Sequence, residues 1–258
     1  MWLKNRKAGK SSSSAKINVS PSLVVYFIAW TVEITISMPF FLYFIVTWTS
    51  ESSTRDGPTL FWLSIWSLAF QPFVQITVLM VTLERISCIH WPAYFKNHRL
   101  KYIFTFVGII FGLALVCLTF IWTLMHELPI PSLIDCNSYA CIYRAGAMEV
   151  SSWIRQILMF MNSIYGIYFF ALLQHRWKAC VTSKLHNHLL NVMAGIVLAA
   201  EFFLNIFPML INKILNRFTD IHLTVIMGPI FNTLLVALDV FVASVIYTLW
   251  MRKRLTRK

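Results

Sequence analysis

Six long apolar runs, separated by shorter polar connections, dominate the pattern along the chain. Each run exceeds the roughly 20 residues that a helix needs to cross ~30 Å of hydrocarbon. The runs lack the strict alternation of membrane β-strands, and backbone groups in lipid must pair internally, so helices are expected. The pattern predicts an all-α membrane protein, a polytopic transmembrane helix bundle with spans at 22–48, 59–83, 102–125, 153–174, 189–211 and 223–250.

Composition excludes a soluble protein. Hydrophobic residues make up 58% of the 258 residues and charged residues only 12%, whereas soluble domains carry about 25% charged residues. The net charge of +12 does not indicate nucleic-acid binding, because the basic residues lie in connections between apolar runs and do not cluster on a polar domain.

The basic residues also predict an orientation. Seventeen of the 22 Lys and Arg residues lie in the N-terminal segment, the second and fourth connections and the C-terminal tail, and five lie on the other side. The positive-inside rule then places both termini in the cytoplasm. We expect a multi-pass protein of the plasma membrane, with a basic segment at 1–21, the bundle at 22–250 and a basic tail at 251–258.

The longest connection between spans, residues 126–152, faces outward in this topology and contains Cys136 and Cys141. An oxidising compartment permits a disulfide between them. Their separation of five residues constrains the geometry of a bridge. Two free thiols are the equal alternative.

Three carboxylates, Glu33, Glu201 and Asp239, lie within apolar runs. Each costs at least ~2.5 kcal/mol at a helix centre, so we expect them to face the bundle interior. All three lie roughly 16–18 Å from the inner surface, where we expect no Lys or Arg. They therefore either are protonated in part or share water and a cation. Polar side chains that can join them are Ser37, Gln71, Gln75, Asn162, Asn205 and Asn232.

This polar layer has two interpretations. It is a ligand site, a cation site or a switch, or it is a structural hydrogen-bond network between helices. The pair Gly108 and Gly112 also has two interpretations. Small residues at this spacing allow close helix approach, within one chain or in a dimer.

The second span ends in Glu84 and Arg85, followed by the segment 91–95, WPAYF. The acid can pair with the adjacent Arg and hold it, and a released Arg offers its donors to a partner that enters from the cytoplasm. An interface anchor is the alternative role for these two residues.

These residues resemble the signature that closes the third helix of serpentine G-protein-coupled receptors. Phe202 lies six residues before Pro208, as in the sixth helix of such receptors, with Ile206 in place of the usual Trp. Tyr247 corresponds to the Tyr of the last-helix motif, whose Asn-Pro is here replaced by Ala-Ser. The likeness covers about 20–258 and is strongest to the nematode serpentine chemoreceptors.

The resemblance implies a rhodopsin-like bundle whose spans correspond to helices two to seven, with helix one missing. It implies a chemosensory receptor that binds a small external molecule and signals to a heterotrimeric G protein at Glu84 and Arg85. Aromatic walls suit a small, partly apolar ligand. Candidate lining residues are Trp62, Trp66, Phe70, Tyr165 and Phe207, for which lipid contact or core packing is the alternative.

The sequence also bears on two other classes of protein. An enzyme is not expected, because only His186 and His188 lie close together and hydrolase, metalloprotease and phosphate-binding motifs are absent from the sequence; no cofactor and no metal are expected. A proton- or cation-coupled transporter or channel would suit the intramembrane carboxylates. The sequence shows no internal repeat, which favours the receptor.

Overall fold

Four long helices form the described part of the protein. The computed structural model describes residues 20–47, 54–91, 98–135, 145–175, 194–200 and 202–208, with isolated positions between 210 and 248. The long helices are α1 (Pro21–Val46), α2 (Gly57–His90), α4 (His98–Glu127) and α5 (Ala145–His175). Each is long and apolar enough to cross a membrane. The all-α polytopic bundle is confirmed, and four of the six predicted spans are visible as such.

The fifth predicted span is described in part, as an apolar helical segment at Ala194–Leu204. It contains η2 (Phe202–Ile206), a π-helical stretch. Pro208 follows η2 by two residues. Because the proline nitrogen carries no hydrogen, it cannot donate the usual backbone hydrogen bond to the preceding turn, and this loss accounts for the local change from α- to π-helical geometry. Nearly all of the sixth predicted span, 223–250, lies outside the described residues.

Three of the helices, α4, α5 and α2, extend beyond the predicted spans at both ends, whereas α1 ends two residues before its predicted end. The two ends of α2 show why this helix is longer. At its start, the Asp56 carboxylate accepts the Thr59 amide at 3.0 Å and caps α2, with Pro58 in the first turn. At its end, α2 continues past residue 83 to His90. Charged residues do not end it, because Glu84 and Arg85 pair with each other inside the bundle.

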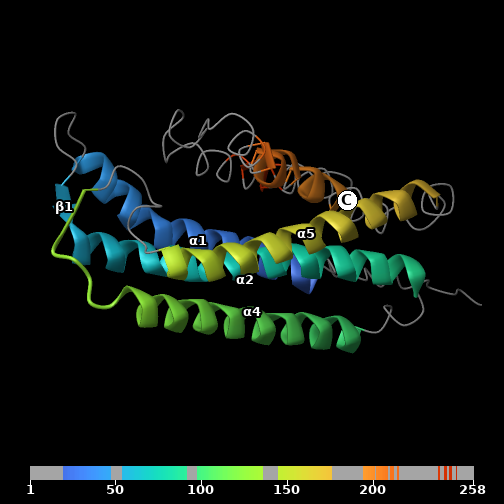
Figure 1. Cartoon of the computed structure of the whole chain (residues 1–258). Coiled ribbons are helices and arrows are strands. Elements are labelled where there is room, and N and C mark those ends of the chain that lie inside the picture. Colours follow the sequence, from blue (N-terminus) through green and yellow to red (C-terminus); the bar gives the residue numbers. More distant parts are fainter. Residues whose placement is uncertain are drawn as a thin grey trace, which may run out of the picture.

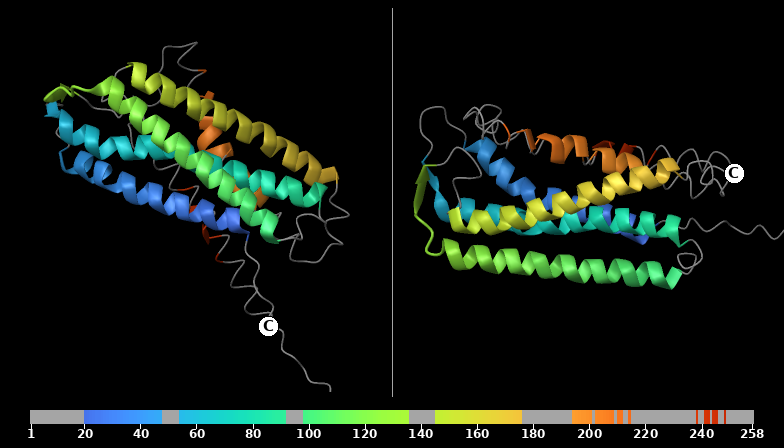
Figure 2. Two further views of the ribbon diagram at one scale, coloured as in Figure 1. Left: turned by 90° about the horizontal axis from the view of Figure 1, so that it is seen from below. Right: turned by 45° about the vertical axis from the view of Figure 1, so that its right-hand side comes forward.

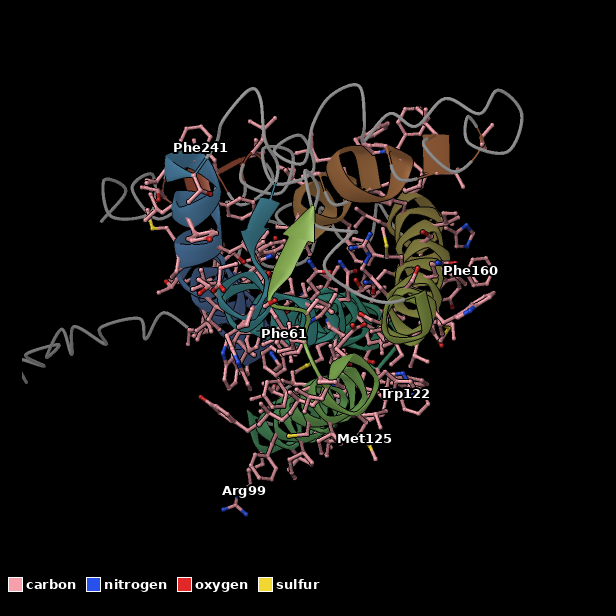
Figure 3. The ribbon with its side chains drawn as sticks, turned by 60° about the vertical axis from the view of Figure 1, so that its left-hand side comes forward. Phe61, Arg99, Trp122, Met125, Phe160 and Phe241 are labelled. Atoms are coloured by element: carbon pink, nitrogen blue, oxygen red, sulfur yellow. The ribbon has the colours of Figure 1, made fainter. Side chains whose placement is uncertain are left out.

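α2 is the central helix. It packs against α1, α4 and α5 (Figures 1 and 2), and a view along the bundle places it between them (Figure 3). In the apolar 18-residue stretch of α2, 78% is buried inside the protein, whereas the share for the corresponding stretch of α4 is 17%. Phe160, labelled in Figure 3, points away from α2 on the outer side of α5 and is 66% exposed, as expected for a lipid-facing residue.

A short antiparallel ribbon joins two connections at one end of the bundle. β1 (Thr54–Asp56) pairs with β2 (Leu133–Asp135), with Arg55 opposite Ile134. We call this end the ribbon end, and the opposite end, where α1 starts and α2 finishes, the Arg85 end. The ribbon joins the segment that precedes α2 to the segment that follows α4.

Gly108 and Gly112 face α2. A Cβ atom on Gly112 would lie 2.6 Å from Phe73 Cδ2, and one on Gly108 would overlap the Met80 side chain. The two glycines therefore serve close packing of α4 on α2 within the chain, which is the intramolecular alternative given for this spacing.

Candidate functional site

Ser67, Gln71 and Gln75 follow one another at single-turn spacing along one face of α2, near the middle of this helix. Each contacts a polar side chain of a neighbouring helix. We call these three residues the polar stripe. Their partners are Glu33 on α1 and Arg155 and Asn162 on α5.

Glu33 is buried, with 6% of its surface exposed. Its Oε1 accepts a hydrogen bond from Ser67 Oγ at 2.8 Å. The Ser37 hydroxyl lies 2.8 Å from Ser67 Oγ and 3.2 Å from Glu33 Oε1. The two serines therefore orient one oxygen of the carboxylate, and the predicted interior position of Glu33 and its link to Ser37 are found in the structure.

The next two positions of the stripe bind α5. Arg155 Nη1 donates to Gln71 Oε1 at 3.1 Å. Asn162 Nδ2 donates to both Gln75 Oε1 at 3.0 Å and the Gln75 carbonyl at 3.1 Å. The expectation that no Lys or Arg reaches the depth of Glu33 is wrong, because Arg155 binds α2 one turn from Ser67. Its long side chain brings the charge to the stripe from near the start of the predicted span.

Three buried polar atoms at this level have no hydrogen-bond partner among the described residues. They are Glu33 Oε2, Asn162 Oδ1 and Trp30 Nε1. More than nine in ten buried polar groups in native proteins are paired, so each exception needs an explanation. An external molecule that donates to two of these atoms and accepts from the third is one such explanation.

Apolar packing surrounds α2 between Gln75 of the stripe and Glu84. Val78 and Val81 of α2 are buried there in one hydrophobic cluster with Tyr26 and Phe169, and we call these four residues the apolar layer. The described residues thus contain two polar networks on α2, one on each side of this layer.

The second network lies at the Arg85 end. Arg85 Nη2 donates to Glu84 Oε1 at 2.8 Å, and Ser20 Oγ donates to Glu84 Oε2 at 2.6 Å. Glu84 is 0% exposed and Arg85 5%. Ser22 and Thr105 share a hydrogen bond of 3.1 Å that connects α1 with α4. The pairing of Glu84 with the adjacent Arg is therefore present, and Ser20 adds a link to α1.

A side-chain contact also joins α2 to α5 at the Arg85 end. His90 Nε2 lies 2.7 Å from the Tyr168 hydroxyl, and the two rings are stacked at an interplanar angle of 9°. His90 is the last residue of α2. This contact holds the final turn of α2 against α5.

The aromatic residues expected to line a ligand site do not lie together. Trp66 packs on Phe120 of α4 with ring centroids 4.7 Å apart. Trp62 and Trp66 each precede a stripe glutamine by nine residues, about two and a half helical turns, so they lie on the opposite face of α2. Phe70 and Tyr165 border the apolar layer, and Phe207 is 44% exposed.

Glu201, Asp239, Cys136 and Cys141 lie outside the described residues, or have side chains that the structure does not describe. Their predicted roles, in the carboxylate layer and as a disulfide, stay predictions.

Three residues at the two polar networks could not be identified from the sequence. Ser20 precedes the first span, and Trp30 resembles any other aromatic residue of an apolar run. Arg155 lies near the start of the fourth predicted span, where its charge is expected to remain at the membrane surface. The signal that was available is the regular spacing of Ser67, Gln71 and Gln75, which indicates one polar face on the second span.

The comparisons with known proteins agree with this architecture. The family model of the serpentine type 7TM GPCR chemoreceptor Srbc matches residues 9–254. No curated protein and no solved structure matches the chain. Since the family match covers nearly the whole sequence, this chain belongs to the Srbc family of serpentine seven-transmembrane chemoreceptors.

Proposed function

We propose that this protein is a chemosensory receptor that binds a small external molecule at the polar stripe and signals to a heterotrimeric G protein at the Arg85 end. The observation that carries this proposal is the placement of two polar networks on one central helix, α2, on either side of an apolar layer. A ligand that prefers one position of α2 shifts the population of conformations at both networks.

In this proposal, Glu84 and Arg85 form the part of the receptor that signals to the G protein. In the structure, the Arg85 guanidinium is buried against Glu84, and the Ser20 hydroxyl donates to the same carboxylate and so links it to α1. Displacement of α2 from α1 separates Ser20 from Glu84 and admits water to the Glu84–Arg85 pair. Water weakens the attraction between the two charges, so that Arg85 can leave Glu84 and contact a cytoplasmic partner through its planar set of donors.

The test is basal signalling in cells that express the full chain with a reporter G protein. Ser20→Ala removes one bond to Glu84 and keeps the ion pair, whereas Glu84→Gln weakens both contacts. We expect basal signalling to rise in both variants, more in Glu84→Gln, at matched surface expression. Thr31→Val, on the exposed face of α1, is the control. Basal signalling at the wild-type level in both test variants would refute the proposed output.

The proposal includes an orientation in the plasma membrane with both termini in the cytoplasm. Tags at the two ends should be inaccessible to antibody until the cells are permeabilised. The sequon at Asn18 should stay unmodified in this orientation. An N-terminal tag that is accessible on intact cells would contradict it.

The apolar layer argues against the transporter or channel alternative, because an ion path along α2 would have to cross fully buried Tyr26, Val78 and Phe169. Phe70 and Tyr165 are the aromatic residues that we retain as apolar walls of the ligand site. Lipid contact is the better role for Trp62 and Trp66, since they turn away from the stripe.

A further inference from the structure

The three unpartnered atoms at the polar stripe occur in a definite order along the bundle. Glu33 is anchored at Ser67, and Asn162 is anchored at Gln75, eight residues or about 12 Å further toward the Arg85 end. Trp30 lies one turn, about 4.5 Å, from Glu33 in the same direction along α1. The order is therefore an acceptor, then a donor, then a second acceptor.

All three side chains are more than nine-tenths buried. The exposed fractions are 6% for Glu33, 4% for Trp30 and 2% for Asn162. Leaving a buried donor or acceptor unpaired is costly, and more so for a charged group. A ligand that pairs these atoms thus recovers part of its own desolvation cost.

The chemistry of the atoms selects the ligand groups. Glu33 Oε2 and Asn162 Oδ1 require N–H or O–H donors, and an ammonium group makes the stronger, charge-assisted bond to a carboxylate. Trp30 Nε1 requires an acceptor. A hydroxyl group both donates and accepts, so it suits either Trp30 or Asn162. A carboxylate ligand pairs with neither acceptor and places a second acid beside Glu33.

We propose that the molecule recognised at this stripe is a small aliphatic amino alcohol. Its ammonium donates to Glu33 Oε2, and its hydroxyl accepts from Trp30 Nε1, one helical turn away on α1. A second ammonium in place of the hydroxyl is disfavoured by Arg155, which binds the intervening Gln71. This inference names the ligand class of the site in the proposed function and rests on it.

Along the bundle axis, the helical rise places Trp30 about 4.5 Å and Asn162 about 12 Å from Glu33. A six-carbon chain between the ammonium and the hydroxyl is long enough to reach from Glu33 to Trp30. The test uses 6-amino-1-hexanol, hexylamine, 1-hexanol and hexanoate as matched probes. Saturable binding to the full chain in lipid nanodiscs is measured by saturation-transfer NMR, with empty nanodiscs as background.

We expect 6-amino-1-hexanol to bind at least tenfold more tightly than hexylamine or 1-hexanol, and hexanoate not to bind saturably. Glu33→Gln should weaken 6-amino-1-hexanol at least tenfold. Trp30→Phe should abolish its advantage over hexylamine. Thr35→Val, on the exposed face of α1 two residues from Glu33, should change neither affinity.

Preferential binding of hexanoate would overturn the inference, as would an unchanged affinity in Glu33→Gln whose thermal unfolding matches that of wild type. Absence of saturable 6-amino-1-hexanol binding to folded wild-type protein would also overturn it. Binding does not depend on a G protein. A protein that binds the amino alcohol but gives no signal in the Ser20 and Glu84 experiment therefore refutes the receptor output and leaves the ligand class standing.

Discussion

Replacing Gly112 by Ala tests how closely α4 packs on α2. The added Cβ would lie 2.6 Å from Phe73 Cδ2 and 3.0 Å from Cε2, well inside the 3.5–4.0 Å of a favourable carbon contact. Phe73 is buried and packs on Phe70 with ring centroids 5.0 Å apart, so its ring has little room to move. Overpacking of this kind costs about 1–3 kcal/mol.

Alanine also stabilises the helix by about 0.5–1 kcal/mol relative to glycine, so we expect a net loss of about 1–2 kcal/mol for Gly112→Ala. The assay is thermal unfolding of the purified full chain, in which such a loss lowers the midpoint by roughly 2–8 °C. Gly166→Ala on α5 is the matched control, because a Cβ there meets nothing within 4 Å. The control should raise the midpoint slightly.

A second substitution tests whether the loss of stability arises from the contact between the new methyl group and Phe73. Phe73→Leu removes the ring atoms that the new methyl group meets, so Gly112→Ala should cost less in that background, as expected for directly contacting residues. The packing argument is refuted if Gly112→Ala is as stable as wild type, or if Gly166→Ala is destabilised to the same extent.

Three further substitutions test single contacts. Asp56→Ala removes the cap of α2 and should cost about 1 kcal/mol in thermal unfolding, while Asp56→Asn keeps an acceptor and should cost less. Asn162→Leu removes both of its bonds to Gln75 and should cost about 1–3 kcal/mol, so an unchanged stability would show that this bridge contributes nothing. Tyr168→Phe deletes the bond to His90 and should accelerate amide exchange in the last turn of α2; exchange as slow as in wild type would contradict a holding role for this contact.

The bundle itself was predictable because its main determinant, the length of apolar runs, is local in the sequence. The ends of the helices were less so. A window of hydropathy ends the second span at 83, where Glu84 and Arg85 begin, but these charges neutralise each other and lie inside the protein. Whether a charged residue ends a span depends on its partner, and here one of the partners, Ser20, is 64 residues away.

The candidate site was predictable only where the position of a residue follows from its own run of sequence. A carboxylate in an apolar run must face the interior, so Glu33 could be assigned from its cost in lipid. The position of Arg155 could not, because a long side chain carries its charge along the bundle. Residue type and depth alone suggest Trp62 and Trp66 as lining residues. Their helical phase relative to Gln71 and Gln75 decides which face of α2 they occupy, and it places them on the opposite face.

The ribbon gives the bundle unequal ends. At the ribbon end, main-chain pairing of β1 with β2, together with the Gly57 amide on the Ser132 carbonyl at 3.1 Å, ties the start of α2 to the connection that follows α4. At the Arg85 end, α2 is tied to α1 and α5 by single side-chain bonds, from Glu84 to Ser20 and from His90 to Tyr168. Each such bond contributes only about 0.5–1.5 kcal/mol. Because Arg85 lies further from the ribbon than the polar stripe does, a tilt of α2 about the ribbon displaces Arg85 further than the stripe.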